Sequence, residues 1–554
     1  MKIRCPLSEL SKRLALLSVF FMFVPGKPQG VSSQAQIVYE IDAGKTVGKN
    51  SRFWQAAGHD FLFQLVHEPA GQELLDRMKQ NGSCTYFRTH YTFSNNTDKD
   101  KLAGGSIGGN VLVIDDRGRF HYDFSKVNRT FSEYVRRGMK PIVEFDFFPD
   151  RMAGNLNGTV NDERFGSRQG APKDWQSWED LLRRFMRNLV DTFGKDELRT
   201  WYFEVWNEPD SWPRKDLRVF FKLYDLFAEV VKSYDAHFKV GGPGCYHVYF
   251  LRDFLEHVVN GTNEVTGKKG APVDFISYHL YGLSGTWLEK PLMIRPEVQR
   301  FTVELLWIER LLKEYQNGLR DAEFHLNEWG LCSHFERTSL QWPQLVYRDD
   351  ETAPLFLTKL VDCLYALEDR YRFKTSLMLY WGFCWEAKQE KLFIGHRELT
   401  TAGNIPKPML TGYEMLAKLG SDRLAVTGPA PGGRTGMLAT RSSNRDVQFL
   451  VYNFCETDDD PDHSDAIEIR WTNLSGKRMT AEMYELDREH NNTFRTWQNL
   501  GKPETLTETI RETLVKAGTL SVTSLENVNI ENGRARIRMN LPRHSMRLFC
   551  AKMQ

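Results

Sequence analysis

The sequence predicts an α/β protein, a (β/α)8 TIM barrel followed by a C-terminal antiparallel β-sandwich domain. Between about residues 58 and 415, eight strand-like runs alternate with helical patterns, and an eightfold βα alternation is typical of this barrel. Several of these runs are continuously apolar, as strands covered on both faces should be. After about residue 420, polar and apolar residues alternate instead, which indicates half-exposed antiparallel strands.

The length of the chain also favours more than one folded unit, because 554 residues exceed what a single ordinary core holds. We expect four segments along the chain. They are a signal peptide at residues 1–35, a strand within 36–57 that pairs with the sandwich, the barrel at 58–419 and the sandwich at 420–554.

The predicted signal peptide combines a basic start, which includes Lys2 and Arg4, with an apolar run at residues 14–25. This run is short for a membrane span, and small residues at 33–35 fit a cleavage site. We therefore expect export, either to the periplasm or as a secreted protein, with no membrane insertion after the leader is cleaved. An uncleaved N-terminal anchor is the alternative.

The bulk composition excludes several classes of partner. A formal net charge of +1 gives no electrostatic case for binding nucleic acid or an anionic membrane. The eight cysteines show neither a CxxC pair nor metal-type spacing, and the sequence has no Gly-rich phosphate loop. The sequence therefore predicts no metal and no cofactor, and it makes no prediction of oligomeric state.

The predicted barrel strands are short apolar and aromatic runs. They lie at His59–Leu65, Thr85–Phe93, Lys140–Pro149, Thr200–Trp206, Val240–Pro243, Asp274–Tyr281, Glu323–Glu328 and Thr375–Trp385. The clearest helix lies between the third and fourth runs, where apolar residues from Trp178 to Val190 follow the 3.6-residue period. Asp174 is its expected N-cap and Gly194 its expected stop.

The predicted sandwich strands show the two-residue period of half-exposed strands. They lie at Val447–Asn453, Ala466–Trp471, Thr480–Leu486, Ala535–Met539 and Ser545–Cys550. The early run Gln36–Asp42 precedes the barrel, and we expect it to pair into this sandwich.

Two glutamates occupy equivalent places, each where an apolar run ends. Glu208 lies in Thr200-Trp-Tyr-Phe-Glu-Val-Trp-Asn-Glu-Pro-Asp210, and Glu328 lies in Glu323-Phe-His-Leu-Asn-Glu-Trp-Gly330. These runs are the fourth and seventh predicted strands, whose C-terminal ends face each other across the mouth of a barrel of this kind. One carboxyl group there can protonate a leaving group while the other attacks from the opposite side. Glycoside hydrolysis uses a pair of carboxyl groups in this way.

The structural alternative for Trp-Asn-Glu-Pro is a helix-entry turn, with a capping Asn and with Pro at the first helical position. The second glutamate motif at the matching strand end argues against this alternative.

An ordered set of motifs resembles glycoside hydrolase family 39, the β-xylosidase and α-L-iduronidase family. The set comprises Arg88-Thr-His90, Lys140-Pro-Ile-Val-Glu-Phe-Asp-Phe-Phe-Pro149, Trp201-Tyr-Phe-Glu-Val-Trp-Asn-Glu-Pro209, Ser277-Tyr-His-Leu-Tyr281 and Ile405-Pro-Lys-Pro408. The resemblance implies Glu208 as the general acid/base and Glu328 as the nucleophile. The chain has Leu-Asn-Glu-Trp-Gly where xylosidase relatives usually show Thr-Glu-Phe or Thr-Glu-Trp, a departure that bears on the substrate.

Further side chains are expected at the barrel mouth. His90 and Asn207 are placed to hydrogen-bond sugar hydroxyls, and Arg88 to support a glutamate from below. His279 and Tyr281 share one face of the sixth strand, where a tyrosine can hold the nucleophile as a carboxylate. The alternatives are a satisfied polar network for the Arg-x-His pair and ordinary rim packing for the other two.

Trp381 and Glu386 follow the eighth strand and complete the predicted substrate-binding set. A tryptophan there can stack under a sugar ring, and core packing is its alternative. Glu204 lies inside the fourth strand and Glu323 begins the seventh, so we expect structural ion pairs from both.

The leading hypothesis is a retaining exo-glycosidase that acts on an oligosaccharide or glycoside, with β-D-xyloside as the first candidate. An α-L-iduronide or another arabinoside- or uronate-type linkage, cleaved by a glycosidase of the same family, is the runner-up. A uronate calls for a basic group near the sugar C5, and His396 and Arg397 are the obvious suppliers. Two rivals belong to other classes. One is a carbohydrate-binding protein that has lost catalysis, and the other makes the sandwich a sugar-binding module.

Overall fold

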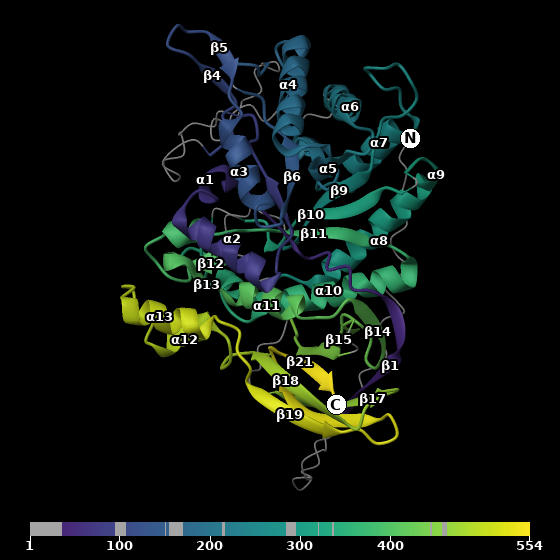
Figure 1. Cartoon of the computed structure of the whole chain (residues 1–554), viewed down its shortest axis with the longest axis vertical. Coiled ribbons are helices and arrows are strands. Elements are labelled where there is room, and N and C mark those ends of the chain that lie inside the picture. The colour runs from purple at the N-terminus through teal and green to yellow at the C-terminus, as the bar shows by residue number, and fades with distance from the viewer. Residues whose placement is uncertain are drawn as a thin grey trace, which may run out of the picture.

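The computed structural model describes residues 36–94, 107–149, 151–154, 170–212, 217–283, 295–319, 321–334, 337–443, 446–456 and 463–554. The predicted signal peptide lies outside these residues. The described chain forms a barrel, in the upper part of Figure 1, and a mostly antiparallel sheet below it. Within the described parts of the chain, no helix has the length and apolar character that crossing a bilayer requires.

Eight parallel strands close into a barrel, which confirms the predicted fold class. Each strand pairs with the next one along the barrel, and the last pairs with the first. In order they are β2 (Ala56–His59), β3 (Tyr86–Thr89), β6 (Lys140–Phe145), β7 (Tyr202–Val205), β8 (Lys239–Cys245), β9 (Phe275–Leu283), β10 (Glu323–Cys332) and β11 (Thr375–Trp381).

The first barrel strand differs from the prediction. The sequence predicts a strand at His59–Leu65, but the strand ends at His59, and Leu62–Leu65 forms the short helix α1. Short apolar runs in helices and strands look alike in sequence, and Leu62, Phe63 and Leu65 are all buried. Consequently Asp60 lies just beyond the strand end, at the face where barrel enzymes carry their active sites.

Helices surround the barrel, and most follow a strand. They are α2 (Pro69–Asn81), α3 (Ser125–Val135), α4 (Trp175–Phe193), α5 (Lys195–Leu198), α6 (Leu217–Tyr234), α7 (Val248–Asn260), α8 (Val298–Glu314), α9 (Gln316–Leu319), α10 (Thr352–Tyr371) and α11 (Pro408–Ala417). The Asp174 carboxylate accepts the amides of Gln176 and Ser177 at the start of α4, as an N-cap does, and Gly194 follows the helix. A hairpin of β4 (Leu112–Ile114) and β5 (Phe120–Tyr122) projects from the barrel (Figure 1).

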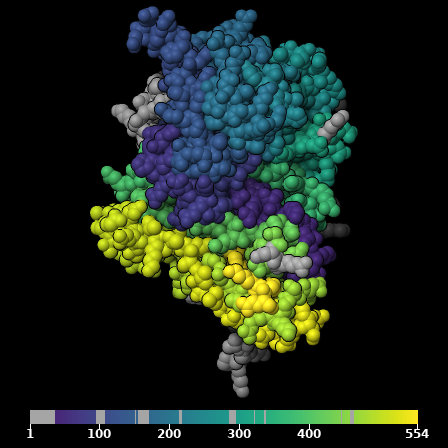
Figure 2. Space-filling view, in the orientation of Figure 1, coloured from purple at the N-terminus to yellow at the C-terminus, as the bar shows by residue number. Residues whose placement is uncertain are grey.

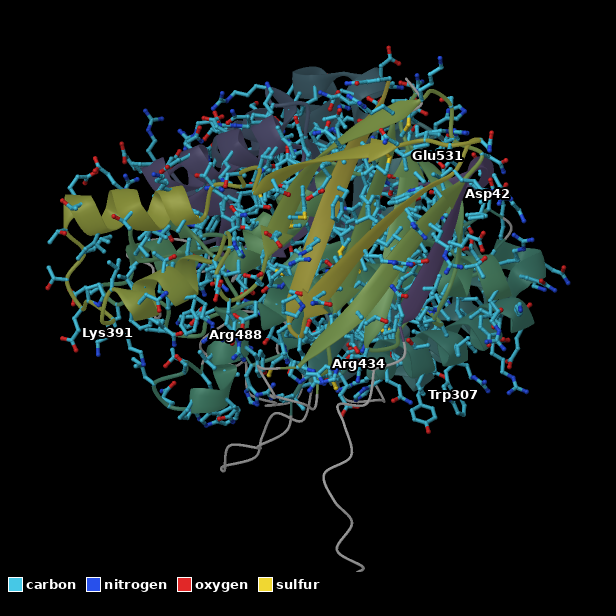
Figure 3. All side chains as sticks on the ribbon, turned by 90° about the horizontal axis from the view of Figure 1, so that it is seen from below. Asp42, Trp307, Lys391, Arg434, Arg488 and Glu531 are labelled. Atoms are coloured by element: carbon cyan, nitrogen blue, oxygen red, sulfur yellow. The ribbon has the colours of Figure 1, made fainter. Side chains whose placement is uncertain are left out.

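The second part is a sheet in the order β19, β18, β21, β16, β15, β14, β1, β17, β20. Its strands are β1 (Ile37–Lys49), β14 (Asp422–Thr427), β15 (Thr435–Arg441), β16 (Val447–Asn453), β17 (Ser464–Thr472), β18 (Arg478–Leu486), β19 (Ser524–Asn529), β20 (Ala535–Pro542) and β21 (Ser545–Met553). Figure 3 shows these strands crossing beneath the barrel, with α12 (Thr493–Asn499) and α13 (Glu508–Ala517) beside them.

This sheet folds over on itself around its own apolar core. Only Asp422 and Arg423 of β14 pair with β15, while β19 and β20, at opposite ends of the strand order, contact each other. The rings of Phe449 and Phe549 stack with centroids 4.5 Å apart inside the resulting core. β1, from the N-terminal end, lies between β14 and β17 and is parallel to β17.

The two parts pack directly on each other through α10 and α11, which lie between the barrel and the sheet (Figure 1), and Figure 2 shows their surfaces in contact. Buried polar groups join them. The Tyr452 hydroxyl donates to Asp362 Oδ2 at 2.9 Å, and Lys359 pairs with Glu456 at 2.6 Å. Such satisfied buried bonds fix the orientation of the sheet relative to the barrel.

Replacing Tyr452 with Phe should destabilise the protein by about 1–3 kcal/mol, because Asp362 then loses its buried donor. Burial raises the pKa of Asp362 to about 7, and the Tyr452 bond opposes that rise. The loss should therefore be larger at pH 8, where the carboxylate is charged, than at pH 5.5. Urea unfolding at both pH values measures it.

Tyr484→Phe is the matched control, because the Tyr484 hydroxyl bonds Glu482 near the surface of the sheet. Equal unfolding midpoints for the two variants at pH 8 would contradict a role for the Tyr452 bond in joining the two parts.

Candidate active site

Glu208 lies immediately after β7, on a backbone that few residues adopt. Trp206 and Glu208 have φ angles of +65° and +47°, and such left-handed conformations cost roughly 1–2 kcal/mol in a residue with a Cβ. The Glu208 amide donates to the Gly244 carbonyl at 2.9 Å, which ties the turn to the end of β8. Strain of this kind, held by the surrounding structure, is common where side chains are aimed at a ligand.

The turn after Glu208 also rules out the capping role for Asn207. Pro209 begins a short 3-10 turn, η1 (Pro209–Ser211), and Glu208 rather than Asn207 occupies the capping position. The Asn207 Oδ1 instead accepts a hydrogen bond from Arg88 Nη2 at 3.1 Å. The Asn207 amide nitrogen is thereby turned away from Arg88.

The carboxyl groups of Glu208 and Glu328 converge on one histidine. His279 Nδ1 lies 3.0 Å from Glu208 Oε1 and 3.4 Å from Glu328 Oε2. One oxygen of each carboxyl group and a ring nitrogen of His279 all lie within 4.8 Å of one another. The Glu208 side chain is 34% exposed and that of Glu328 only 8%. The two acids therefore lie close together in very different solvent environments.

Glu328, inside β10, is held by donors on both oxygens. The Tyr281 hydroxyl donates to Oε1 at 2.5 Å, and Arg88 Nη1 donates to Oε2 at 3.2 Å. Burial is the largest influence on the pKa of Glu328 and raises it. His279 lowers this pKa, the charge of Glu208 raises it again, and Arg88 and the Tyr281 hydrogen bond lower it. The net direction is upward, so Glu328 takes up a proton at a higher pH than an ordinary glutamate.

His279 is charged more readily than an ordinary histidine. Burial lowers its pKa, but the charge of Glu328 and the hydrogen bond to Glu208 outweigh burial, so that its pKa is raised. Nδ1 must carry a proton to donate to either carboxylate.

Arg88, on β3, is wholly buried and organises the floor of the site. Its Nε donates to Glu204 at 2.7 Å, and its Nη2 pairs with Glu144 at 2.6 Å, in addition to its bonds to Asn207 and Glu328. Burial lowers the pKa of Arg88, but the carboxylates of Glu144, Glu204 and Glu328 outweigh it and raise the pKa. One guanidinium thus links four strands of the barrel.

Glu204, expected to be structural, is part of this floor. Besides Arg88, it accepts hydrogen bonds from the Ser277 hydroxyl and from the Asn327 amide, the latter at 2.7 Å. Glu323 lies at the other end of the barrel, where it pairs with Lys239 at 2.8 Å.

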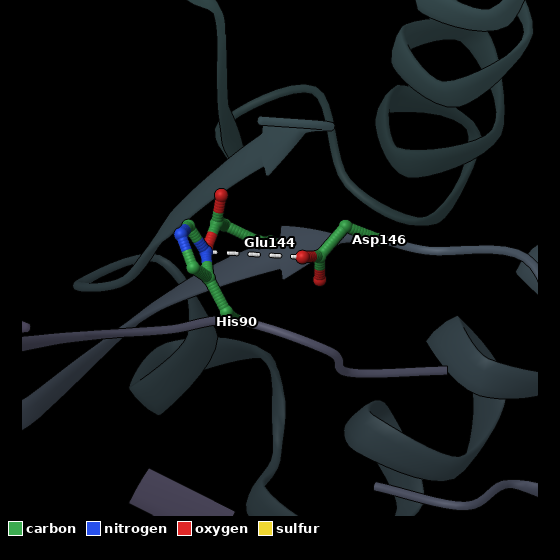
Figure 4. A group of neighbouring side chains, drawn as sticks. All are labelled: His90, Glu144 and Asp146. Atoms are coloured by element: carbon green, nitrogen blue, oxygen red, sulfur yellow. Dashed lines mark hydrogen bonds and ion pairs between the residues drawn. The ribbon is translucent and has the colours of Figure 1, made fainter. Parts of the chain in front are cut away.

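His90 lies beside Glu144 and Asp146, as Figure 4 shows. Its Nδ1 bonds the Glu144 carboxylate and lies 3.8 Å from Asp146, while Asp146 accepts the backbone amides of Tyr91 and Thr92 at 2.9 and 3.0 Å. Glu144 therefore joins Arg88 to His90. Burial raises the pKa of Glu144 well above its ordinary value, although Arg88 opposes the rise.

Trp381, at the end of β11, lies next to His90, with ring centroids 4.4 Å apart. Its Nε1 donates to Asp60 Oδ2 at 3.2 Å, and Arg397 Nη2 donates to the same oxygen at 3.0 Å. The Arg397 charge also opposes the rise in the pKa of Tyr281, and the charge of Glu328 helps to raise the pKa of Arg397. The sequence gives no sign that Asp60 belongs to the site, because the predicted strand His59–Leu65 places this residue inside a strand.

Two other predicted groups lie apart from this cluster. Glu386 was expected to bind substrate, but it is completely buried, bonded to Lys407 and to the Thr401 hydroxyl. The turn η4 (Trp385–Lys388) carries it into this separate network, where burial raises its pKa to about 7. Burial also lowers the pKa of His396 to about 3, so this ring is neutral.

Among the described residues of the barrel, two clusters have the ligand types and spacing that could hold a metal ion. They are His90 with Glu144 and Asp146, and Glu208 with His279 and Glu328. Their carboxylates already have partners: Glu144 pairs with Arg88, Asp146 accepts backbone amides, Glu328 accepts hydrogen bonds from Tyr281 and Arg88, and Glu208 bonds His279. We therefore assign both clusters to the hydrogen-bond network of the site.

Comparison with known proteins identifies relatives along most of the chain. The family model for glycosyl hydrolases family 39 matches residues 37–523. A beta-xylosidase of Caldicellulosiruptor saccharolyticus is 23% identical over 516 residues, which cover 91% of this chain and 96% of that protein. An alpha-L-iduronidase of Mus musculus is 23% identical over 354 residues, 59% of this chain and 54% of that protein. The crystal structure of a monomeric beta-xylosidase from Caulobacter crescentus CB15 matches with a TM-score of 0.75 at 21% identity, covering 93% of this chain and 99% of that one.

Replacing Arg88 with Met should destabilise the protein by about 3–5 kcal/mol, because three buried carboxylates lose their shared counter-ion. Arg183→Met is the control; Arg183 forms an exposed pair with Glu179 on α4, so its loss should cost no more than ~1 kcal/mol. Urea unfolding measures both variants. Equal unfolding midpoints would show that Arg88 does not hold the floor together.

Proposed function

The chain belongs to glycosyl hydrolase family 39, and from that premise we propose that it is a retaining, exo-acting glycosidase whose substrate is a β-D-xyloside. The observation that carries the mechanism is the approach of the Glu208 and Glu328 oxygens to within 4.8 Å, with His279 between them. Retaining glycosidases place their carboxyl groups about 5–5.5 Å apart, whereas inverting enzymes need about 6.5–9.5 Å to admit a water. An approach of one oxygen from each carboxyl group to within 4.8 Å supports the retaining arrangement over the inverting one.

In the first step, Glu208 protonates the glycosidic oxygen while a Glu328 oxygen attacks the anomeric carbon. The bond from that carbon to the glycosidic oxygen breaks, the leaving group departs with the proton, and a covalent glycosyl-enzyme remains. The more exposed acid is suited to exchange protons with solvent. The buried one, fixed by Tyr281 and Arg88, is suited to be the nucleophile.

In the second step, the Glu208 carboxylate takes a proton from water, and the water oxygen attacks the anomeric carbon. Glu328 is released, and the product keeps its original anomeric configuration. The hydrogen bonds from Tyr281 and Arg88 to Glu328 then form again on a free carboxylate.

The sugar is bound by the polar and aromatic groups around the two acids. The Asn207 amide nitrogen is free of the bond that its oxygen makes with Arg88, and it donates to a sugar hydroxyl. His90 bonds Glu144 through Nδ1, and we assign its Nε2, which lies 3.9 Å from Asp60 Oδ1, to a further sugar hydroxyl. Trp381 supplies the ring beneath the sugar.

Xyloside is preferred over iduronide on two grounds. The xylosidase relative matches almost its whole length, whereas the iduronidase relative matches 54% of its length. A uronate also needs a cation for its carboxylate, and Arg397 is already paired with Asp60. The position of Arg397 nevertheless makes an α-L-iduronide the second candidate, and parallel assays with aryl β-D-xyloside and aryl α-L-iduronide distinguish the two.

The same assays test the rival from another class. A carbohydrate-binding protein without catalysis would cleave neither glycoside, although it would bind one of them. NMR of the first-formed product tests the mechanism, since a β-anomer from a β-xyloside means retention and an α-anomer would exclude the covalent route.

Glu208→Ala and Glu328→Ala should separate the two roles. With a good leaving group, Glu208→Ala should still form the glycosyl-enzyme, and added azide should restore turnover and give the retained glycosyl azide. Glu328→Ala should fail in the first step, and azide can then yield only the inverted product. Each replacement should lower kcat by at least roughly a hundredfold, Glu208→Ala through the slow second step and Glu328→Ala through the first. Retained azide product from the Glu328 variant would reverse the assignment.

The acid limb of the pH profile of kcat/KM should lie above the ordinary glutamate value, because Glu328 must be ionised and burial raises its pKa. Tyr281→Phe removes a donor that favours the charged form, so its acid limb should move up by roughly one pH unit. Tyr86→Phe, whose hydroxyl bonds the Thr200 carbonyl at the barrel bottom, is the control. If the acid limb of Tyr281→Phe lies at the same pH as that of the wild type, a group other than Glu328 determines it.

A further inference from the structure

The loop that carries Glu208 is fastened to the neighbouring loop between β8 and α7. Asp210 Oδ2 accepts the backbone amides of Tyr246 and His247 at 2.9 and 2.8 Å. The Glu208 amide donates to Gly244, the last residue but one of β8. Two hydrogen bonds to backbone amides of this second loop and one to the end of β8 thus fix the loop against the turn that holds the acid/base.

Both backbone polar groups of Tyr246 are therefore held by side chains. Its amide is bound by Asp210, and its carbonyl accepts the Tyr278 hydroxyl at 2.9 Å. Its ring packs edge-on against His247, with centroids 4.3 Å apart. A large aromatic side chain on so rigid a backbone is nonetheless 37% exposed.

Tyr246 stands on the loop that Asp210 and the Glu208 amide hold next to the acid/base. Burial raises its pKa, and the charges of Asp210 and Glu208 raise it further. Exposed aromatic surface next to a site of this kind is characteristic of ligand contacts.

The chemistry fixes where a leaving group must lie. It receives its proton from Glu208 and departs on the side of the anomeric carbon opposite Glu328. Glu208 is one-third exposed and Glu328 is almost covered, so the site opens on the Glu208 side. The rim on that side includes the loop that Asp210 fastens.

We propose that Tyr246, positioned by Asp210, forms a wall of the leaving-group subsite and takes the apolar face of a second sugar ring. The enzyme is accordingly selective for saccharide leaving groups over small alcohols. This inference rests on the proposed retaining mechanism, because the same subsite then receives the acceptor in the second step.

The partition of the glycosyl-enzyme between two acceptors tests the subsite. The intermediate is formed from β-xylosyl fluoride, whose leaving group has no ring, and is offered xylose and methanol together. Glu208 serves as the base for both acceptors, so damage to the acid/base cancels in the ratio of transfer products. Tyr246→Ala should lower the xylose-to-methanol ratio by at least about tenfold, whereas Tyr246→Phe, which keeps the ring, should retain most of it.

Tyr249→Ala is the matched control. Tyr249 lies in the first turn of α7, is 78% exposed, and its replacement should leave the ratio as in the wild type. An unchanged ratio in Tyr246→Ala, a Tyr246→Phe variant that behaves like Ala, or a wild-type enzyme that prefers methanol would each overturn the inference. Failure to turn over the fluoride at all would instead refute the proposed function, and the two failures are therefore distinct.

Discussion

The site depends on one buried cation. Arg88 is inaccessible to solvent; it donates hydrogen bonds of 2.7 to 3.2 Å to Glu204, Asn207 and Glu328 and forms an ion pair of 2.6 Å with Glu144. Three carboxylates and one amide, from β6, β7 and its following turn, and β10, could not be buried this close together without a shared donor, since each unpaired charge would be costly to desolvate. The planar guanidinium suits this task because its donors point in fixed directions.

From this centre the site extends as a gradient of solvent exposure. Glu204 and Glu144 are wholly buried, Glu328 is nearly so, and Glu208 is open to solvent. The same gradient separates what each carboxylate can do. Glu204 and Glu144 are buried and fix the geometry of the floor. Glu328 is oriented by donors on both oxygens, and Glu208, the exposed acid, exchanges protons with solvent. The left-handed backbone at Trp206 and Glu208 is the local strain that turns the exposed acid toward its partner.

The barrel and the main groups around its mouth could be predicted because they rest on short-range patterns. Glu208 follows the apolar run that forms β7, Glu328 lies within the longer run that forms β10, and the geometry of a closed barrel brings both to its mouth. Asp60, Glu144 and Tyr246 could not be found in this way. Asp60 was hidden by a strand boundary misplaced among apolar residues, Glu144 lies inside a strand and acts through His90 and Arg88, and Tyr246 depends on hydrogen bonds between two loops. Glu386 is a carboxylate that follows a barrel strand, as a substrate-binding residue would. Lys407, a buried lysine distant in sequence, pairs with it and holds it in a separate network away from the site.

The most direct test of the account is to trap the glycosyl-enzyme. A 2-deoxy-2-fluoro-β-xyloside with a good leaving group slows both steps, because the fluorine disfavours positive charge at the anomeric carbon, and the second step is slowed most. Mass spectrometry of the intact protein should then show one added fluoroxylosyl group, and peptide mapping should place it on Glu328. An unlabelled protein that nevertheless hydrolyses xylosides, or a label on Glu208 or any other residue, would contradict the assignment of the nucleophile.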